Sequence, residues 1–306
     1  MTANVLTRLL VPLDGSPECE IGYAYAAAIA GPSTEIVLGR AVSPIDGDRL
    51  DPSVLSAVTD TAVSRASLEL AETAKRLAPT LDLKVEARVG SPVDVMLGIA
   101  DRVQATMIVA ATHGRGSIGR WVYGSVTDRM ARLSPIPVAL VRVGAPRPAA
   151  KPARVVVPLD GSALAEEALP VAAAIARTHG IPVMLLTAID AGQFAVATSP
   201  LPTSGAPAGV MPELWDMLKE TAAQTLAHGQ ADPALNGLEV SAVSRVGTAQ
   251  AVIDEVAGPA DVVVLTSHGR TGFKRVMLGS VAEHVVRFAD CPVVLVPNRE
   301  RKDGQP

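Results

Sequence analysis

Two copies of one sequence pattern follow each other along the 306-residue chain, and this internal repeat constrains the fold more than any other feature. The segment Leu10-Val-Pro-Leu-Asp-Gly-Ser16 returns as Val156-Val-Pro-Leu-Asp-Gly-Ser162, identical at six of its seven positions. Later landmarks return in the same order. For example, Pro137-Val-Ala-Leu-Val141 returns as Pro292-Val-Val-Leu-Val296. A repeat of this length indicates that one structural unit is duplicated.

Each copy is close to a common domain size of roughly 150 residues, so the repeat predicts two compact domains. We place them at residues 1–146 and 150–306, around a proline-rich linker, Gly144-Ala-Pro-Arg-Pro-Ala-Ala-Lys-Pro152, which we expect to be semi-rigid. The second copy is longer by about eleven residues. These fall within 190–212, a stretch rich in proline that matches neither hydrophobic period and predicts a loop.

Short runs of β-branched residues alternate with longer helical patterns in both copies, which predicts βαβ units around a parallel sheet. Hydrophobic residues make up 48% of the chain but aromatic residues only 3%, a balance that suits buried parallel strands of Val, Ile, Leu and Ala. The fold class is therefore α/β, with two doubly wound five-stranded parallel sheets. The expected strands are 6–13, 35–42, 82–89, 106–111 and 137–143 in the first copy, and 154–159, 182–189, 239–246, 261–266 and 292–297 in the second.

Composition excludes several function classes. The formal net charge is −4 and the Lys and Arg residues are scattered, which argues against a nucleic-acid surface. Cys19 and Cys291 are the only cysteines, and neither lies in a motif of metal-ligand spacing. No apolar run approaches the roughly 20 residues of a membrane span, and the N-terminus lacks an export signal. We expect a cytoplasmic protein that binds neither nucleic acid nor membranes.

Each copy carries a glycine-bearing loop after its fourth strand. In both loops nine residues separate a His-Gly-Arg glycine from a Gly-Ser pair. Glycine lets the backbone approach a phosphate closely, because it has no Cβ and tolerates positive φ. The candidate residues are Ala111, His113, Gly114, Arg115, Gly124 and Ser125 in the first copy, and Thr266, His268, Gly269, Arg270, Gly279 and Ser280 in the second.

The serines that end these loops allow two interpretations. Ser125 and Ser280 each precede a predicted helix and carry an acid three residues later, Asp128 and Glu283, which is the spacing of a capping box. In one interpretation each serine only caps its helix. In the other, the helix N-terminus also presents N–H groups and a positive dipole end to a phosphate.

Asp14 and Asp160 follow the first strands, where an Asp commonly forms a turn or caps the next helix. The sheet order changes their interpretation. If the order is 3-2-1-4-5, the switch point lies between strands one and four, and ligands bind outside the carboxyl ends there. The Asp and the glycine loop would then flank one crevice.

Known catalytic motifs are missing. His113 and His268 have no nucleophile at a recognisable spacing, and a lone loop histidine is usually structural. Neither G-x-S-x-G, H-E-x-x-H nor a Walker A sequence occurs. Gly114-Arg-Gly116-Ser-Ile-Gly119 matches G-x-G-x-x-G as a string, but it follows a fourth strand, and the second copy has Thr271 and Lys274 in place of the later glycines. We reject a dinucleotide site there.

Taken together, these motifs resemble universal stress protein domains over nearly the whole chain. The ATP-binding members of that family carry Gly-x-x-Gly-(nine residues)-Gly-Ser/Thr. The later positions are matched by Gly114, Gly124 and Ser125, and by Gly269, Gly279 and Ser280. The first glycine is replaced by Ala111 and Thr266, whose side chains we expect to crowd the phosphates.

The resemblance also implies the rest of the pocket and the assembly. It implies an adenine nucleotide α-hydrolase-like fold in which the last strands pair the two copies into a pseudo-dimer, and a chain that forms homodimers. It assigns Asp14 and Asp160 to the adenosine, Pro12 and Pro158 to the pocket wall, Ala41 and Ala188 to the side of the base, and Gly90 and Gly247 to the ribose side.

Three functions remain open. The preferred one is an ATP-binding regulatory protein of the stress response, with one adenine-nucleotide site per copy and ATP, with or without Mg²⁺, as the ligand. The second is a nucleotide-free dimerisation scaffold of the same fold. An enzyme with at most weak ATP hydrolysis is favoured least, because the sequence offers a phosphate cradle but no convincing base or metal ligands.

Overall fold

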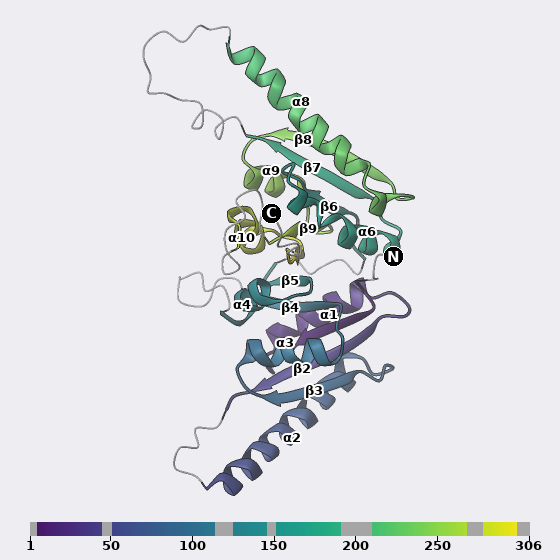
Figure 1. Cartoon of the computed structure of the whole chain (residues 1–306). Helices are drawn as coiled ribbons and strands as arrows, with labels where there is room; N and C mark the ends of the chain where they lie inside the picture. Colours follow the sequence, from purple (N-terminus) through teal and green to yellow (C-terminus); the bar gives the residue numbers. More distant parts are fainter. Residues whose placement is uncertain are drawn as a thin grey trace, which may run out of the picture.

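The fold was obtained as a computed structural model, which describes residues 5–44, 51–113, 125–145, 151–190, 210–267 and 278–298. These residues form one ten-stranded sheet of order β3-β2-β1-β4-β5-β10-β9-β6-β7-β8, with helices on both faces (Figure 1). The two expected five-stranded sheets are therefore present but joined into one. Most of the expected loop at 190–212 lies outside the described residues, and helix α8 begins at Val210.

All ten expected strands are confirmed, each within two residues of its expected bounds. The strands are β1 (Arg8–Pro12), β2 (Glu35–Val42), β3 (Lys84–Val89), β4 (Met107–His113), β5 (Val138–Val143), β6 (Val155–Pro158), β7 (Val183–Ile189), β8 (Val240–Val246), β9 (Val262–Thr266) and β10 (Val293–Val296). The helices are η1 (Pro17–Cys19), α1 (Glu20–Ile29), α2 (Pro52–Leu77), α3 (Pro92–Arg102), α4 (Ser125–Leu133), α5 (Ala163–Glu166), α6 (Leu169–His179), α8 (Val210–Gln230), η2 (Pro233–Leu235), α9 (Ala249–Val256) and α10 (Ser280–Phe288).

Each half-sheet is doubly wound, as expected, with the order 3-2-1-4-5. Helices α1 and α2 pack on one face, where Tyr25 and Leu70 lie in one core cluster. Helices α3 and α4 pack on the other face, where Met96 and Met130 lie in a second cluster. Strands β1 and β4 are therefore neighbours whose following helices leave on opposite faces, and this places the switch point between them. In the second repeat, β6 and β9 hold the equivalent positions.

Strands β5 and β10 join the two repeats. They pair antiparallel, with Val138 opposite Leu295, Ala139 opposite Val294, and Leu140 opposite Val293. Ala139 and Val294 occupy equivalent positions in the two repeats, 155 residues apart, so a pseudo-two-fold axis passes between them. The expected pairing of the copies through their last strands is confirmed, and it has the self-complementary form of a two-fold dimer interface.

Side-chain contacts across this junction break the two-fold symmetry. Arg142 Nε donates to the carbonyl oxygen of Ala289 at 3.2 Å, and the same guanidinium pairs with Asp290. The equivalent residues in the opposite repeats are Pro297 and Pro135, which cannot form such a pair. The contact therefore favours pairing of the first repeat with the second over pairing of two identical repeats.

The first repeat, produced alone as residues 1–146, is expected to self-associate, because β5 becomes an unpaired edge strand. The association should be weaker than the intramolecular pairing, since Arg142 would then face Pro135. Sedimentation velocity over a concentration series measures this, with the full chain as the reference. A first repeat that stays monomeric at every concentration would contradict the expectation.

Candidate functional site

The backbone pairing between β1 and β4 is short. Strand β1 pairs with β2 over five residues, Arg8 to Pro12, but with β4 only at Leu9 and Leu10. The second repeat shows the same pattern, since β6 pairs with β9 only at Val155 and Val156. The carboxyl ends of these strands flank the switch point, where open α/β sheets bind ligands, so we place the candidate site there.

Proline explains why the ladder ends there. The N–H of Leu13 donates to Gly39 of β2 at 2.8 Å, and alternate residues of a strand direct their backbone groups to opposite neighbours. The N–H of the residue before Leu13 would therefore point to β4, but that residue is Pro12, which has none. In the second repeat Leu159 donates to Leu186 at 2.8 Å, and Pro158 removes the donor toward β9.

The described members of the expected site gather at this carboxyl edge. Pro12, Asp14, Ala41, Gly90, Ala111 and His113 lie at or just beyond the ends of β1 to β4, and Pro158, Asp160, Ala188, Gly247 and Thr266 lie at the matching places in the second repeat. Gly279 and Ser280 lie at the start of α10. Gly114, Arg115, Gly124, His268, Gly269 and Arg270 lie outside the described residues, as do the side chains of His113 and Ser125.

Both aspartates form the turn that follows the first strand. Asp14 Oδ1 accepts the N–H of Ser16 at 2.8 Å. Asp160 Oδ1 accepts the N–H of Ser162 at 3.0 Å and its hydroxyl at 2.6 Å. The turn-forming interpretation is therefore confirmed. It is compatible with ligand binding, because an ionised carboxylate has about four acceptor positions.

Two glycines after the third strands have backbones that other residues rarely adopt. Gly90 has φ +145° and Gly247 has φ +144°. Each donates its N–H back to the second strand, to Val42 at 3.0 Å and to Ile189 at 3.1 Å. Backbone conformation alone accounts for glycine here. Proximity to a ribose stays a prediction.

The capping-box interpretation is wrong for α10. The residue that caps this helix is Gly279, with φ −61° and ψ 150°, and it makes no side-chain cap hydrogen bond. Ser280 is already the first helical residue. Glu283 pairs with Arg287 at 2.6 Å instead of reaching back to the helix start. The helix start thus retains N–H groups and a positive dipole end that can face an anion.

The same pairing recurs in the first repeat, where Asp128 pairs with Arg132 at 2.8 Å. In both repeats an arginine therefore offsets the negative charge of the acid in the first turn. This lowers the repulsion that such an acid would exert on a phosphate at the helix start.

Ala111 and Thr266 are the two residues expected to crowd a ligand. Ala111 is 6% exposed and lies in the core cluster on the face that α1 covers. Thr266 is 7% exposed. Helix α1 lies close above β4 there, since a Cβ placed on Gly22 would lie 3.4 Å from the Ala111 nitrogen. Both side chains are nearly fully buried, and crowding of a ligand by either one stays a prediction.

Cys19 is a neighbour of Asp14 that the sequence motifs did not indicate. Burial is the main cause that raises the pKa of its thiol, and the Asp14 carboxylate raises it further. A thiol with a raised pKa is a poor nucleophile at neutral pH, because the thiolate is the reactive form. Alanine occupies the matching position, Ala165, in the second repeat. Cys19 therefore contributes packing rather than reactivity.

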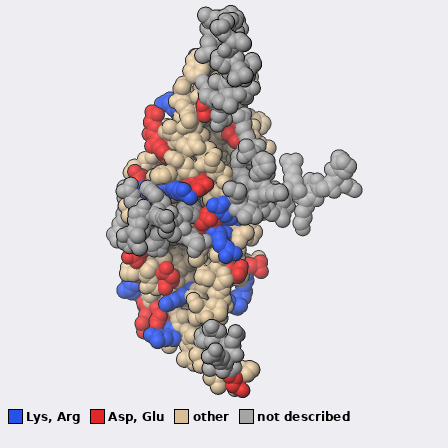
Figure 2. Space-filling model, turned by 90° about the vertical axis from the view of Figure 1, so that its left-hand side faces the viewer, with Lys and Arg blue, Asp and Glu red and all other residues tan. Residues whose placement is uncertain are grey.

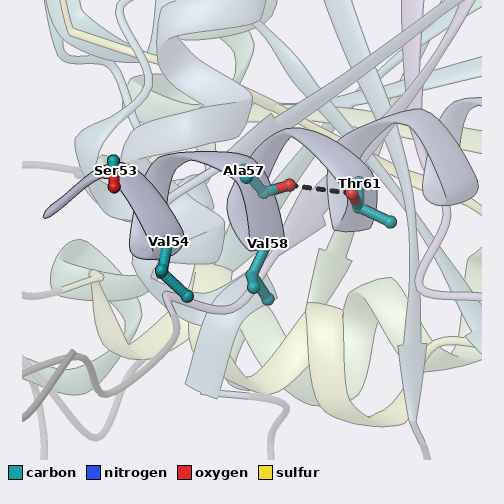
Figure 3. A pocket seen from close by; sticks show the side chains of 5 residues that line it. All are labelled: Ser53, Val54, Ala57, Val58 and Thr61. Atoms are coloured by element: carbon teal, nitrogen blue, oxygen red, sulfur yellow. Dashed lines mark hydrogen bonds between the residues drawn. The ribbon is translucent and has the colours of Figure 1, made fainter. Parts of the chain in front are cut away.

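A second surface feature lies on α2, away from the expected site. A shallow groove of about 360 Å³ follows one side of α2, where Val54 and Val58 are 47% and 43% exposed (Figure 3). None of its described lining residues is charged and none belongs to the expected site. In the described part of the face in Figure 2, acidic and basic side chains are intermixed. Among the described residues, no three His, Cys, Asp or Glu side chains are grouped as metal ligands, and no helix is long and apolar enough to span a bilayer.

Comparison with known proteins agrees with this architecture. The sequence model of the universal stress protein family matches residues 6–142 and 152–297. A universal stress protein of Mycolicibacterium smegmatis is 28% identical over 303 residues, covering 95% of this chain and 97% of that protein. A solved universal stress protein from Archaeoglobus fulgidus superposes with a TM-score of 0.56 at 18% identity, covering 95% of this chain and 98% of that one. A structure from Pseudomonas aeruginosa UCBPP-PA14 gives a TM-score of 0.57 at 15% identity, covering 96% and 94%.

Replacing Ala111 with glycine is expected to leave nucleotide affinity within about twofold, because its methyl group is buried in the core cluster on the α1 face. The free energy of unfolding should fall by roughly 0.5–1 kcal/mol, the usual cost of glycine within a strand. Titration calorimetry and denaturant unfolding measure the two quantities. A clear gain in affinity would restore the crowding hypothesis.

Proposed function

We propose, from the fact that the chain belongs to the universal stress protein family, that it is an ATP-binding regulatory protein of the stress response with one adenine-nucleotide site in each repeat. The observation that carries this proposal is the early end of the strand ladder at the switch point. It recurs in both repeats, and in each one a proline removes the next backbone donor. The recurrence argues for two sites of one kind.

Asp14 and Asp160 would hold the adenosine end of the nucleotide. Each follows the first strand on a turn closed by its own hydrogen bond, so the carboxylate is fixed before a ligand arrives. Ala41 and Ala188 are the penultimate residues of the neighbouring strands β2 and β7. Their small side chains leave room for a flat base beside the strand ends.

The starts of α4 and α10 would hold the phosphates. The N–H groups of a helix N-terminus and its positive dipole end favour an anion, and α10 has no side-chain cap to compete for them. Gly124 and Gly279 precede these helices in the sequence and would let the backbone approach the phosphates. ATP would bring Mg²⁺ with it as a complex.

The described residues favour binding over chemistry. Cys19 is the nucleophilic side chain beside Asp14, and its raised pKa makes it a poor nucleophile. Among the described residues, no His, Cys, Asp or Glu cluster is suited to a resident metal ion. A regulatory role, in which bound nucleotide changes the binding of a partner, fits these features better than rapid hydrolysis of ATP.

The alternative is a scaffold of the same fold that binds no nucleotide. The paired strands β5 and β10 favour it, because an architecture built around a two-fold junction is complete without a ligand. A measurement of ATP binding distinguishes the two functions, because the scaffold would bind no nucleotide.

Replacing Gly279 with valine is expected to weaken ATP binding at the second site at least tenfold, about 1.4 kcal/mol. The backbone at Gly279, with φ −61° and ψ 150°, suits any residue, so the effect should come from side-chain bulk beside the phosphates rather than from misfolding. Titration calorimetry measures it. Gly98→Val is the control, because a Cβ at Gly98 meets no atom within 4 Å. Equal affinities for the two variants would contradict the proposed phosphate position.

Replacing Asp160 with asparagine tests the adenosine end without removing the turn, since the amide oxygen can still accept the Ser162 N–H. ATP affinity at the second site should fall by about 1–3 kcal/mol through the loss of a charged acceptor. Calorimetry against the parent protein gives the value. A parent protein that binds no ATP would favour the scaffold function. An ATP affinity that is unchanged by this substitution would contradict the assignment of Asp160 to the adenosine end.

A further inference from the structure

Arg40 lies against the turn that carries Asp14. A Cβ placed on Gly15 would lie 3.0 Å from Arg40 Nη2, 3.4 Å from Cζ and 3.5 Å from Nη1. These similar distances mean that the guanidinium group faces the glycine and fills the space of a side chain. Gly15 also has φ +95°, so both its conformation and its neighbour require glycine.

Helix α2 holds this guanidinium in place. Arg40 Nη1 pairs with Glu69 Oε2 at 2.9 Å, and Arg65 Nε donates to Glu69 Oε1 at 2.9 Å. The Arg40 side chain is only 23% exposed, so the cation is enclosed between α2 and the turn. Arg76 Nη1 of the same helix donates to Glu20 Oε2 of α1 at 3.0 Å, on the other side of the turn.

The second repeat has a neutral residue at the position that matches Arg40. The residue before Ala188, equivalent to Arg40 before Ala41, is Thr187. Its hydroxyl donates to the carbonyl oxygen of Leu159 at 3.1 Å. From α8, Thr225 Oγ1 lies 3.0 Å from a Cβ placed on Gly161. Both repeats therefore support the aspartate turn from the same helix layer, the first with an ion pair and the second with hydroxyl groups.

We propose that Arg40 and Glu69 form a positioning pair for Asp14, so that nucleotide affinity at the first site depends on this ion pair. This rests on the proposed nucleotide function. Arg40 acts through the turn and does not touch the ligand. Because an ion pair between partly exposed groups weakens as salt rises, the first site acquires an additional dependence on ionic strength through this pair.

The support of the turn can be measured without nucleotide. Amide exchange at Ser16 reports the hydrogen bond to Asp14, and amide exchange at Ser162 reports its counterpart. Arg40→Gln is expected to speed exchange at Ser16 about threefold to tenfold and to leave Ser162 unchanged. Unchanged exchange at Ser16 would overturn the positioning role even if ATP did not bind.

ATP titrations then test the consequence for binding. They use the Gly279→Val background, which isolates the first site. Arg40→Gln and Glu69→Gln should each weaken ATP binding about threefold to tenfold, and the double substitution should cost no more than either alone. The loss should shrink as salt rises. Thermal unfolding of each variant shows whether the fold is retained.

The matched control is Glu35→Gln. Glu35 pairs with Arg8 at 2.6 Å across the same two strands, but at their opposite ends. If Glu35→Gln weakened ATP binding as much as Glu69→Gln does, the loss of affinity would reflect lower overall stability, and the proposal would be overturned. If the background binds no ATP, the nucleotide function fails, and the exchange experiment still decides the role of Arg40.

Discussion

The short ladder between β1 and β4 is the constraint on which the candidate site depends. These strands are separated by almost a hundred residues of chain, yet they pair at Leu9 with Met107 and at Leu10 with Ile108. The pairing places the end of the first strand beside the end of the fourth. Pro12 removes the next donor toward β4, and the ladder ends beside the switch point. Pro158 does the same in the second repeat.

Most of the fold could be predicted because strands buried on both faces leave a strong sequence signal. Val155, Val156 and Val157 are fully buried, and a run of such residues bounded by Pro158 has few other interpretations. The junction between the repeats was a weaker prediction. It came from a family resemblance, because residue patterns alone do not specify which edge strands pair, or that Arg142 would make the pairing asymmetric.

The candidate site was predicted less completely, for physical reasons. A serine three residues before an acid has the spacing of a capping box. The sequence does not show whether that serine is the capping residue or, like Ser280, the first residue of the helix. Ala111 was expected to crowd a ligand because it replaces a glycine of the family pattern, and the sequence does not show that its side chain is buried in the core cluster on the α1 face. Arg40 was missed although one signal was present. It is the charged residue inside the apolar run Ile36 to Val42, and such a residue needs a partner that only the fold supplies.

The central claim is that the candidate sites of both repeats bind the same class of ligand. Mass spectrometry of the intact 31.5 kDa chain under native conditions, with increasing ATP, tests it directly because it counts bound ligands. Two successive additions of one ATP mass per chain are predicted, with adenosine also added but more weakly, since it lacks the phosphates that the helix starts would hold. A chain that adds no nucleotide at ATP concentrations well above those in cells would contradict the account.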